Sequence, residues 1–193
     1  MEREELKNLA AKKAVEYIKD GMIIGLGTGS TTEYAIRKIG KLVENGLDIK
    51  GIPTSVHTKR VAKECNIQLT TLEENPEIDL TIDGADEVDS NLNLIKGGGG
   101  ALTREKIIAY HSKQEIIIVD DSKVVKSLGI DFPLPVEVIK FGWELTKKAI
   151  EKFDCNVKLR KIMNELYITD NSNYILDCEF DKIQDAEELE KEL

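Results

Sequence analysis

The sequence is poor in cysteine, histidine and aromatic residues, and each scarcity excludes a class of protein. Its 193 residues include three cysteines and two histidines, and aromatic residues make up 5%. The cysteines are odd in number, with no Cys-x-x-Cys pair, which excludes a zinc ribbon and a thioredoxin-type motif. We therefore expect reduced, mostly buried thiols. His57 and His111 have no ligand spacing, which disfavours a zinc site, and we expect both on helix surfaces.

A long apolar run and an excess of positive charge are also missing. No apolar stretch approaches the roughly 20 residues of a membrane-spanning helix, and the charged start Met1-Glu-Arg-Glu-Glu is unlike a signal peptide. The net charge of -9 disfavours non-specific binding to nucleic acid or to an anionic membrane. These features predict a cytoplasmic protein with a small-molecule partner, bound where the charge is locally reversed.

Short apolar runs alternate with helical patterns up to about residue 130. This alternation predicts an α/β fold, a Rossmann-like parallel sheet covered by helices, as the catalytic domain over residues 1–130. The expected strands are 22–26, 48–52, 67–70, 78–82 and 115–119, and the expected helices are 2–19, 34–45, 57–65 and 102–112.

The pattern changes after residue 130, where strands and helices follow one another at short intervals. Residues 131–193 therefore predict a smaller α+β (ferredoxin-like) subdomain. Its expected elements are a strand at 136–139, a helix at 143–153, a strand at 156–159, a hairpin of 166–169 with 174–178, and a helix from 185.

The loop at residues 25–32, Gly-Leu-Gly-Thr-Gly-Ser-Thr-Thr, lies between an expected strand and an expected helix. Its glycines let the backbone approach a ligand closely. N–H groups at a helix start suit a phosphate, as do the hydroxyls of Thr28, Ser30 and Thr31. The loop lacks the lysine of a Walker motif, and Thr32 replaces the last glycine of a dinucleotide fingerprint. The alternative is an ordinary strand–helix turn with a Ser or Thr cap.

Two carboxylates, Asp83 and Asp86, directly follow the apolar strand at 78–82. Ligands bind at the carboxyl ends of strands in open parallel sheets. The pair therefore suits a metal, sugar hydroxyls or acid–base work. An all-oxygen magnesium site and a solvated acidic turn stay open as alternatives.

Four consecutive glycines, at 97–100, follow Lys96 and precede a helix that contains Glu105. Ordering four glycines is costly in backbone entropy, and a nest of N–H groups around an anion, such as an oxyanion forming on a substrate, is a natural reason for it. If Thr103 caps the helix, Glu105 falls in the first turn, where the helix dipole favours the ionised carboxylate that a general base needs. A flexible loop before an acidic helix start is the alternative.

Weaker candidates are Thr54-Ser55 and Lys123, which follow strand ends, and Lys7 on the first helix. Taken singly, each is more often a surface residue. Taken together, the segments supply phosphate-binding features, two carboxylates, a lysine, an anion nest and a base, without a Ser–His pair or a metal cluster. That combination fits proton transfer beside a carbonyl.

The motifs together resemble ribose-5-phosphate isomerase of the A type. The matching runs occur in the family's order over roughly residues 1–180. These runs are 25–31, 82–88, 95–107, 121–123 and 132–138. The family continues with a Gly-Val-Val segment, a Gly-Leu-Phe-like segment and a final strand, which this sequence does not contain. We therefore expect differences at the edge of the main sheet and in the small subdomain.

The resemblance implies interconversion of ribose 5-phosphate and ribulose 5-phosphate through an enediolate, in the pentose phosphate pathway. It implies that Glu105 moves a proton between C1 and C2. Asp83, Asp86 and Lys96 would hold the open-chain sugar, and the N–H groups of 97–99 would bind the oxyanion. The remaining expected contacts to the sugar phosphate are Lys7, Thr28, Gly29, Ser30, Thr31, Gly84, Ala85, Gly97, Gly98, Gly99 and Lys123.

The resemblance also implies that no cofactor is used and that the protein is a homodimer or homotetramer. Two other functions compete with the isomerase. An amino-sugar-phosphate deaminase is disfavoured by the lack of a histidine near Asp83, Asp86 or Glu105. A sugar-phosphate-sensing domain of a transcription regulator would need an attached basic DNA-binding helix and would have no use for Glu105 as a base.

Overall fold

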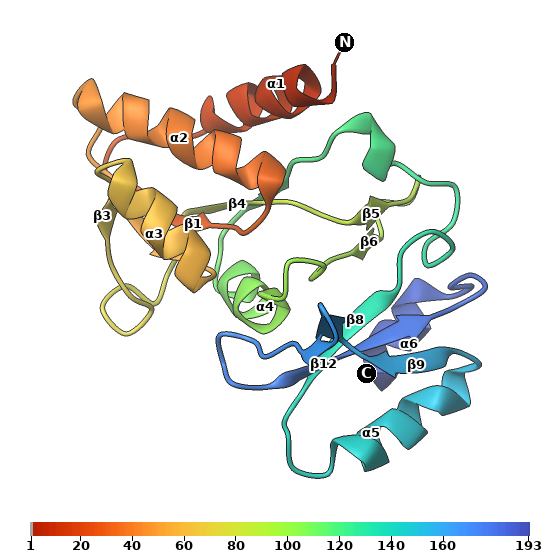
Figure 1. Cartoon of the computed structure of the whole chain (residues 1–193). Coiled ribbons are helices and arrows are strands. Elements are labelled where there is room, and N and C mark those ends of the chain that lie inside the picture. Colours follow the sequence, from red (N-terminus) through yellow and green to blue (C-terminus); the bar gives the residue numbers. More distant parts are fainter. Residues whose placement is uncertain (1) are drawn as a thin grey trace. The chain divides into compact units, whose positions relative to one another are not determined.

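The computed structural model describes residues 2–193, which form two compact units (Figure 1). The first unit comprises the residues up to Gly84 together with Thr103–Ser122, and the second comprises Ala85–Leu102 together with Lys123–Leu193. Both units are thus discontinuous in sequence, whereas a single boundary near residue 130 stays a prediction. No helix among residues 2–193 has the length and apolar character needed to cross a membrane.

The first unit contains a five-stranded sheet in the order β3-β2-β1-β4-β7, and every neighbouring pair is parallel. This confirms the predicted α/β fold. The strands are β1 (Ile23–Leu26), β2 (Lys50–Pro53), β3 (Gln68–Leu69), β4 (Leu80–Asp83) and β7 (Glu115–Ile117). The helices are α1 (Arg3–Val15), α2 (Ser30–Glu44), α3 (Val56–Glu64) and α4 (Leu102–Tyr110).

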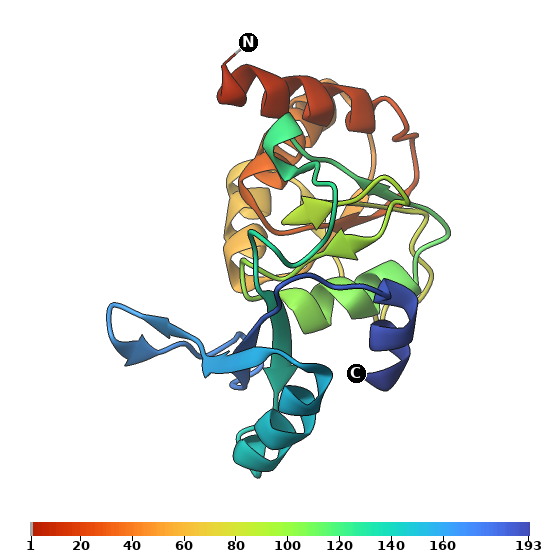
Figure 2. The ribbon, with the colours of Figure 1, turned by 90° about the vertical axis from the view of Figure 1, so that its right-hand side faces the viewer.

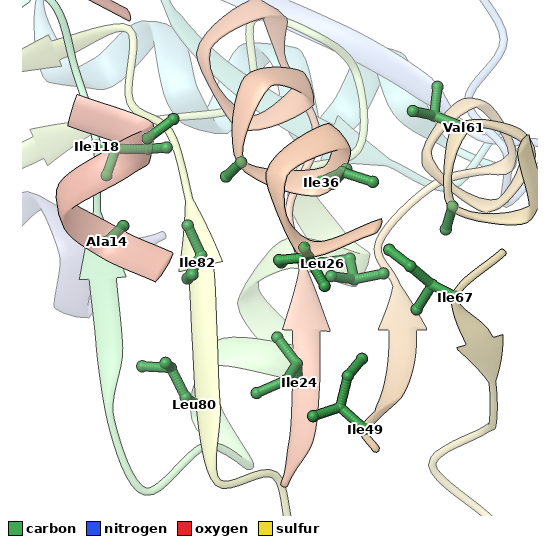
Figure 3. Packing of buried hydrophobic residues seen from close by; sticks show 14 residues of the cluster. Ala14, Ile24, Leu26, Ile36, Ile49, Val61, Ile67, Leu80, Ile82 and Ile118 are labelled. Carbon is green, nitrogen blue, oxygen red and sulfur yellow. The ribbon is translucent and has the colours of Figure 1, made fainter. Parts of the chain in front are cut away.

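Side chains of β1 point alternately to the two faces of the sheet, as in any β-strand. Ile24 and Leu26 are buried in the main core cluster with residues of α1, α2 and α3, and Figure 3 shows this packing. Ile23 lies on the opposite face and packs against a second cluster that includes Ile108 of α4. The strand is apolar throughout because both faces are covered.

The strand order reverses between β1 and β4. From β1 the chain runs outward through β2 to β3, and it then returns to the other side of β1 as β4. In open parallel sheets, ligands bind beyond the carboxyl ends of the strands at such a reversal. The loop after Leu26 and the carboxylate of Asp83 therefore occupy the favoured position in this unit.

The second unit is built around an antiparallel sheet in the order β8-β12-β9. Its strands are β8 (Leu134–Val138), β9 (Asn156–Leu159) and β12 (Tyr174–Glu179), with helices α5 (Trp143–Ile150), η2 (Glu151–Phe153) and α6 (Ala186–Glu192). A separate two-stranded piece pairs β5 (Glu87–Val88) with β6 (Leu94–Ile95), which the sequence pattern did not reveal. Strands of two residues are too short to show a period.

The predicted hairpin of 166–169 with 174–178 is wrong. Strand β12 has β8 on one side and β9 on the other, so neither edge is open to residues 166–169. Instead β10 (Lys161–Ile162) pairs with β11 (Glu165–Leu166), forming the blue hairpin of Figure 2. Met163 and Asn164 both have positive φ, 51° and 68°, as a tight turn between two strands requires. Methionine is not a typical turn residue, which hid this hairpin in the sequence.

Candidate active site

Asp83 links the loop after β1 to the end of β4. Its side chain is buried, and its Oδ1 atom accepts hydrogen bonds from the main-chain N–H groups of Thr28 (3.1 Å) and Gly84 (2.7 Å). The bond to Thr28 joins residues 55 positions apart in the sequence. The carboxylate thus fixes the backbone at the point where the strand order reverses.

Gly27 allows this close approach. A Cβ atom on Gly27 would lie 2.1 Å from Oδ1 of Asp83 and 2.6 Å from its Cα atom, so any other residue would push the strands apart. Gly29, which precedes α2, has a φ of 145°, a conformation that L side chains rarely adopt. The glycine pattern that suggested a ligand loop therefore corresponds to two real backbone requirements.

The hydroxyl of Thr28 lies in a cluster of hydroxyl groups. Its Oγ1 atom is 2.7 Å from Oγ1 of Thr54, 2.8 Å from Oγ of Ser55 and 3.0 Å from Oγ1 of Thr58. Ser55 also caps α3 by accepting from the N–H of Thr58. Thr54 and Ser55, the weaker candidates, thus lie against the loop, and their hydroxyls form hydrogen bonds with other protein groups.

Three further candidates lie in α2 and α4. Ser30 is exposed and Thr31 is half-buried in the first turn of α2, so both present polar groups at a helix start. Glu105 is buried, with 3% of its surface exposed, and it is in the first turn of α4 as expected. The helix begins at Leu102, however, so Thr103 belongs to the first turn and does not cap it.

Lys7 lies on α1 with only 12% of its side chain exposed, and its Nζ is 3.5 Å from Oε1 of Glu4. Its charge acts on Asp120, which is buried shortly after β7. Burial raises the pKa of Asp120. Hydrogen bonds from Ser122 and the charges of Arg3 and Lys7 lower the pKa, and together they outweigh burial. The net effect holds the pKa of Asp120 below its usual value. The charge of Lys7 thus favours the ionised form of Asp120.

In the second unit, Asp86 is joined to the glycine run. Its Oδ2 atom accepts a hydrogen bond of 2.7 Å from the N–H of Gly98, and its own N–H donates to the carbonyl of Ile95 at 2.8 Å. The pairing of β5 with β6 brings the two segments together. Lys96 follows β6 directly and is half-buried. The structure thus brings two separately identified motifs into contact.

Lys123 has an aromatic neighbour that sequence reasoning missed. Its Nζ is 5.8 Å from the centre of the Phe132 ring. The same ring lies beside the glycine run, because a Cβ atom on Gly98 would be 2.7 Å from Cζ of Phe132. Phe132 lies in the matching run 132–138 but carries no polar group, so its residue type does not mark it as a site residue.

Arg160 and Tyr167 also contact the glycine run and were not predicted. Arg160 donates to main-chain carbonyls of the run across 63 positions of sequence, and the hydroxyl of Tyr167 donates to the carbonyl of Gly99 at 3.3 Å. No local spacing signals a contact over such a distance.

The histidines lie where the sequence predicted, whereas the cysteines are less buried than expected. His57 and His111 are both exposed, and each lies on or directly after a helix. Cys65, Cys155 and Cys178 are free thiols, of which Cys178 is buried and the other two are half-buried. Among residues 2–193 there is no group of three or more histidine, cysteine, aspartate or glutamate side chains placed to hold a metal ion.

Comparison with known proteins places the chain in a family. The family profile of ribose 5-phosphate isomerase A (phosphoriboisomerase A) matches residues 50–193. The chain belongs to this family. The ribose-5-phosphate isomerase A of Bacillus mycoides is 50% identical over 189 residues, which are 97% of this chain and 85% of that protein. Membership of an isomerase family decides against the deaminase and sensor alternatives.

Solved isomerase structures have the same fold. The ribose 5-phosphate isomerase A of Methanocaldococcus jannaschii matches with a TM-score of 0.93 and 45% identity, over 99% of this chain and 86% of that chain. A D-ribose-5-phosphate isomerase in complex with phospho-erythronic acid matches with a TM-score of 0.96 and 45% identity, over 100% of this chain and 86% of that chain. The parallel sheet covered by helices is therefore the isomerase fold.

Proposed function

We propose that this chain interconverts ribose 5-phosphate and ribulose 5-phosphate, as an aldose–ketose isomerase of the non-oxidative pentose phosphate pathway. The observation that carries the proposal is the 50% identity to an isomerase over 97% of the chain. The local geometry supports it, since a buried carboxylate, Glu105, stands in the first turn of a helix that follows a run of four glycines.

The proposed chemistry is proton transfer through an enediolate. Glu105 takes the proton from C2 of the open-chain aldose and returns it to C1, while the hydroxyl proton of O2 moves to O1. Negative charge develops on the substrate oxygens in between. N–H groups of the glycine run stabilise that charge, because fixed donors need no reorganisation during the reaction. Those of Gly98 and Gly100 already donate to Asp86 and to the carbonyl of Gly97, so the role falls to the other N–H groups of the run. No electron acceptor is needed, since aldose and ketose are isomers.

Asp83, Asp86 and Lys96 hold the sugar in this proposal. Two carboxylates accept hydrogen bonds from sugar hydroxyls, and the lysine donates to a sugar oxygen. These groups also assist ring opening, in which the ring oxygen gains a proton and O1 loses one. The bonds that Oδ1 of Asp83 and Oδ2 of Asp86 accept from the backbone support the proposal, because they fix both carboxylates in position.

The phosphate is held by hydroxyls, backbone N–H groups and two lysines. Ser30 and Thr31 present hydroxyls at the start of α2, where the helix dipole favours an anion. Lys7 and Lys123 supply the positive charge. The other proposed ligand contacts come from the backbone at Thr28, Gly29, Gly84 and Ala85. This arrangement agrees with the exposure of Ser30, whereas the hydroxyl of Thr28 is already engaged by the protein.

The proposal includes a homodimer or homotetramer that works in the cytoplasm without a cofactor. It rests on the family resemblance for all three properties. Size-exclusion chromatography with light scattering tests the oligomeric state, and a mass equal to one 21.6 kDa chain would contradict it.

The test of the function is a direct assay. The purified chain is incubated with ribose 5-phosphate, and ribulose 5-phosphate is measured with and without a chelator. We expect conversion in both cases, and a second assay from ribulose 5-phosphate should reach the same equilibrium. No conversion by the folded protein would contradict the proposal, and loss of activity that a divalent ion restores would contradict the metal-free chemistry.

A further inference from the structure

The glycine run has a second set of partners on its carbonyl side. Nη1 of Arg160 donates to the carbonyl of Gly98 at 3.0 Å and lies 3.3 Å from the carbonyl of Gly97. The hydroxyl of Tyr167 lies 3.3 Å from the carbonyl of Gly99. All of these residues belong to the second unit. Three consecutive carbonyls of the run are therefore held by two side chains.

Arg160 is itself held firmly. Its Nε lies 2.9 Å and 3.1 Å from the two carboxylate oxygens of Asp177, and Nη2 binds the same carboxylate. The two side chains are 11% and 19% exposed. The main-chain N–H of Arg160 also donates to the carbonyl of Ile175 at 2.8 Å. Because a bidentate pair of this kind fixes the plane of the guanidinium, the hydrogen-bond donors that face the glycines are fixed too.

Because the peptide bond is planar, a contact that orients a carbonyl also orients the N–H group of the next residue. In a trans peptide, the carbonyl of one residue and the N–H of the next point in opposite directions. A Gly97 carbonyl that faces Arg160 directs the N–H of Gly98 away, and that N–H donates to Asp86 at 2.7 Å. A Gly98 carbonyl that faces Arg160 likewise directs the N–H of Gly99 away from the guanidinium.

The N–H of Gly99 is available to a ligand, and Arg160 orients the peptide that carries it. The next N–H in the run, that of Gly100, donates to the carbonyl of Gly97 at 3.0 Å. Within residues 2–193, the N–H of Gly99 has no such acceptor, and Gly99 is exposed. Its direction is set by Arg160 through the preceding peptide.

We propose that Arg160 is a positioning residue for the isomerisation: held by Asp177, it binds the carbonyls of Gly97 and Gly98 and directs the N–H of Gly99 toward the enediolate oxygen. The inference rests on the proposed function, since it assigns that oxyanion as the ligand. The guanidinium also polarises the two peptide groups that it binds, which strengthens their N–H donors.

The test separates the transition state from the ground state. Arg160→Met keeps much of the side-chain length and removes both donors and charge. We expect kcat for ribose 5-phosphate to fall about 10- to 100-fold, somewhat less than the loss of an oxyanion donor, while KM changes less than about threefold. Affinity for phospho-erythronic acid, whose carboxylate is an anion, should fall by a larger factor than KM rises.

Lys158→Met is the matched control for Arg160→Met, and two further variants complete the test. Lys158→Met removes an exposed ion pair with Glu179 on the same sheet, so kcat should stay within twofold of the original chain. Asp177→Asn weakens the hold on Arg160 and should lower kcat in the same direction. If Arg160→Met does not fold, Arg160→Lys replaces it, because an ammonium cannot reproduce the fork that binds Asp177 and two carbonyls.

Two results would overturn the inference. One is an unchanged kcat in a folded Arg160 variant, and the other is a loss that lies wholly in KM. A wild-type chain that does not convert ribose 5-phosphate contradicts the proposed function instead, so the two failures are distinguishable.

Discussion

The main-chain N–H of Thr28 donates a hydrogen bond to Oδ1 of Asp83 over 3.1 Å. This bond joins the residues that follow β1 and those that end β4, where the order of the strands reverses. One carboxylate oxygen thereby shapes the loop that leads into α2, while the residue itself is a candidate ligand of the sugar. The two roles of Asp83 can be separated by substitution.

Asp83→Ala should destabilise the protein more than Asp83→Asn. Alanine removes the acceptor of the N–H groups of Thr28 and Gly84, which are partly buried, so the cost lies toward the lower end of about 1–3 kcal/mol for each. Asparagine keeps an oxygen at the position of Oδ1 and should cost less. Urea unfolding measures both. Asparagine should still lower kcat, because it lacks the negative charge. Equal destabilisation by the two variants would show that the carboxylate oxygen does not hold the loop.

Gly27→Ala should be poorly tolerated, whereas Gly84→Ala should leave the stability nearly unchanged. A Cβ atom at Gly27 would lie 2.6 Å from the Cα atom of Asp83, so the backbone must move, at about 1–3 kcal/mol. A Cβ atom at Gly84 meets nothing nearer than Oγ1 of Thr32 at 3.4 Å. Thermal unfolding of both variants is the measurement. Equal midpoints would mean that the two strand ends are less closely packed than described.

Asp79 should make stability depend on pH in acid. A hydrogen bond from Lys113 (2.8 Å), and then one from the N–H of Ile23 (2.9 Å), lower the pKa of Asp79. A lowered pKa in the folded state adds stability above the unfolded pKa, about 3.9. That contribution is lost as the pH falls through the folded value.

Asp79→Asn should therefore lower stability at pH 7 and flatten its dependence on pH below about 4, as measured by urea unfolding across a pH series. Glu77→Gln is the matched control. Glu77 is 82% exposed and its Oε2 is 4.0 Å from Nζ of Lys113, so its removal should change little. An unaltered acid limb in Asp79→Asn would contradict the assignment.

Cys178 should be unreactive in the folded protein. Burial raises the pKa of its thiol to about 12, with smaller contributions from Cys155 and Asp177. Only the thiolate attacks alkylating reagents, so at pH 8 very little of Cys178 is reactive. Mass spectrometry after treatment with iodoacetamide should find Cys178 unmodified until the protein is unfolded, while the half-buried Cys65 is modified sooner. Rapid modification of native Cys178 would contradict the packing of the second unit.

Much of the candidate site could be proposed from the sequence because its residues follow strand ends. The runs at 25–32 and 83–86 place small or polar residues where apolar strands end. The sheet brings the run at 25–32 to Asp83, which accepts a hydrogen bond from Thr28. The contact between Asp86 and Gly98 was not predictable, since it depends on the pairing of β5 with β6. Strands of two residues leave no periodic trace in the sequence.

Arg160 illustrates a different limit. It stands in an ordinary polar stretch, and the role proposed for it depends on contacts with Asp177 and the glycine run, which lie 17 and more than 60 positions away. The mispredicted hairpin has a related cause. Residues 166–169 resemble a strand locally, but β8 and β9 already occupy both edges of β12. Local pattern sets which segments can form strands, and competition among edges decides which strands pair.

The central claim is that Glu105 transfers the proton in this isomerisation. Its most direct test is conversion of ribose 5-phosphate in D2O, with deuterium in the product measured by NMR or mass spectrometry, for the original chain and for Glu105→Gln. Circular dichroism and binding of phospho-erythronic acid establish that the variant is folded and retains its site.

We expect the original chain to convert the substrate and to place solvent deuterium on the carbon that receives the proton. Glu105→Gln should bind the analogue with similar affinity, lower kcat by at least about 1,000-fold and incorporate no deuterium on the same time scale. Full turnover with deuterium incorporation by folded Glu105→Gln would contradict the account.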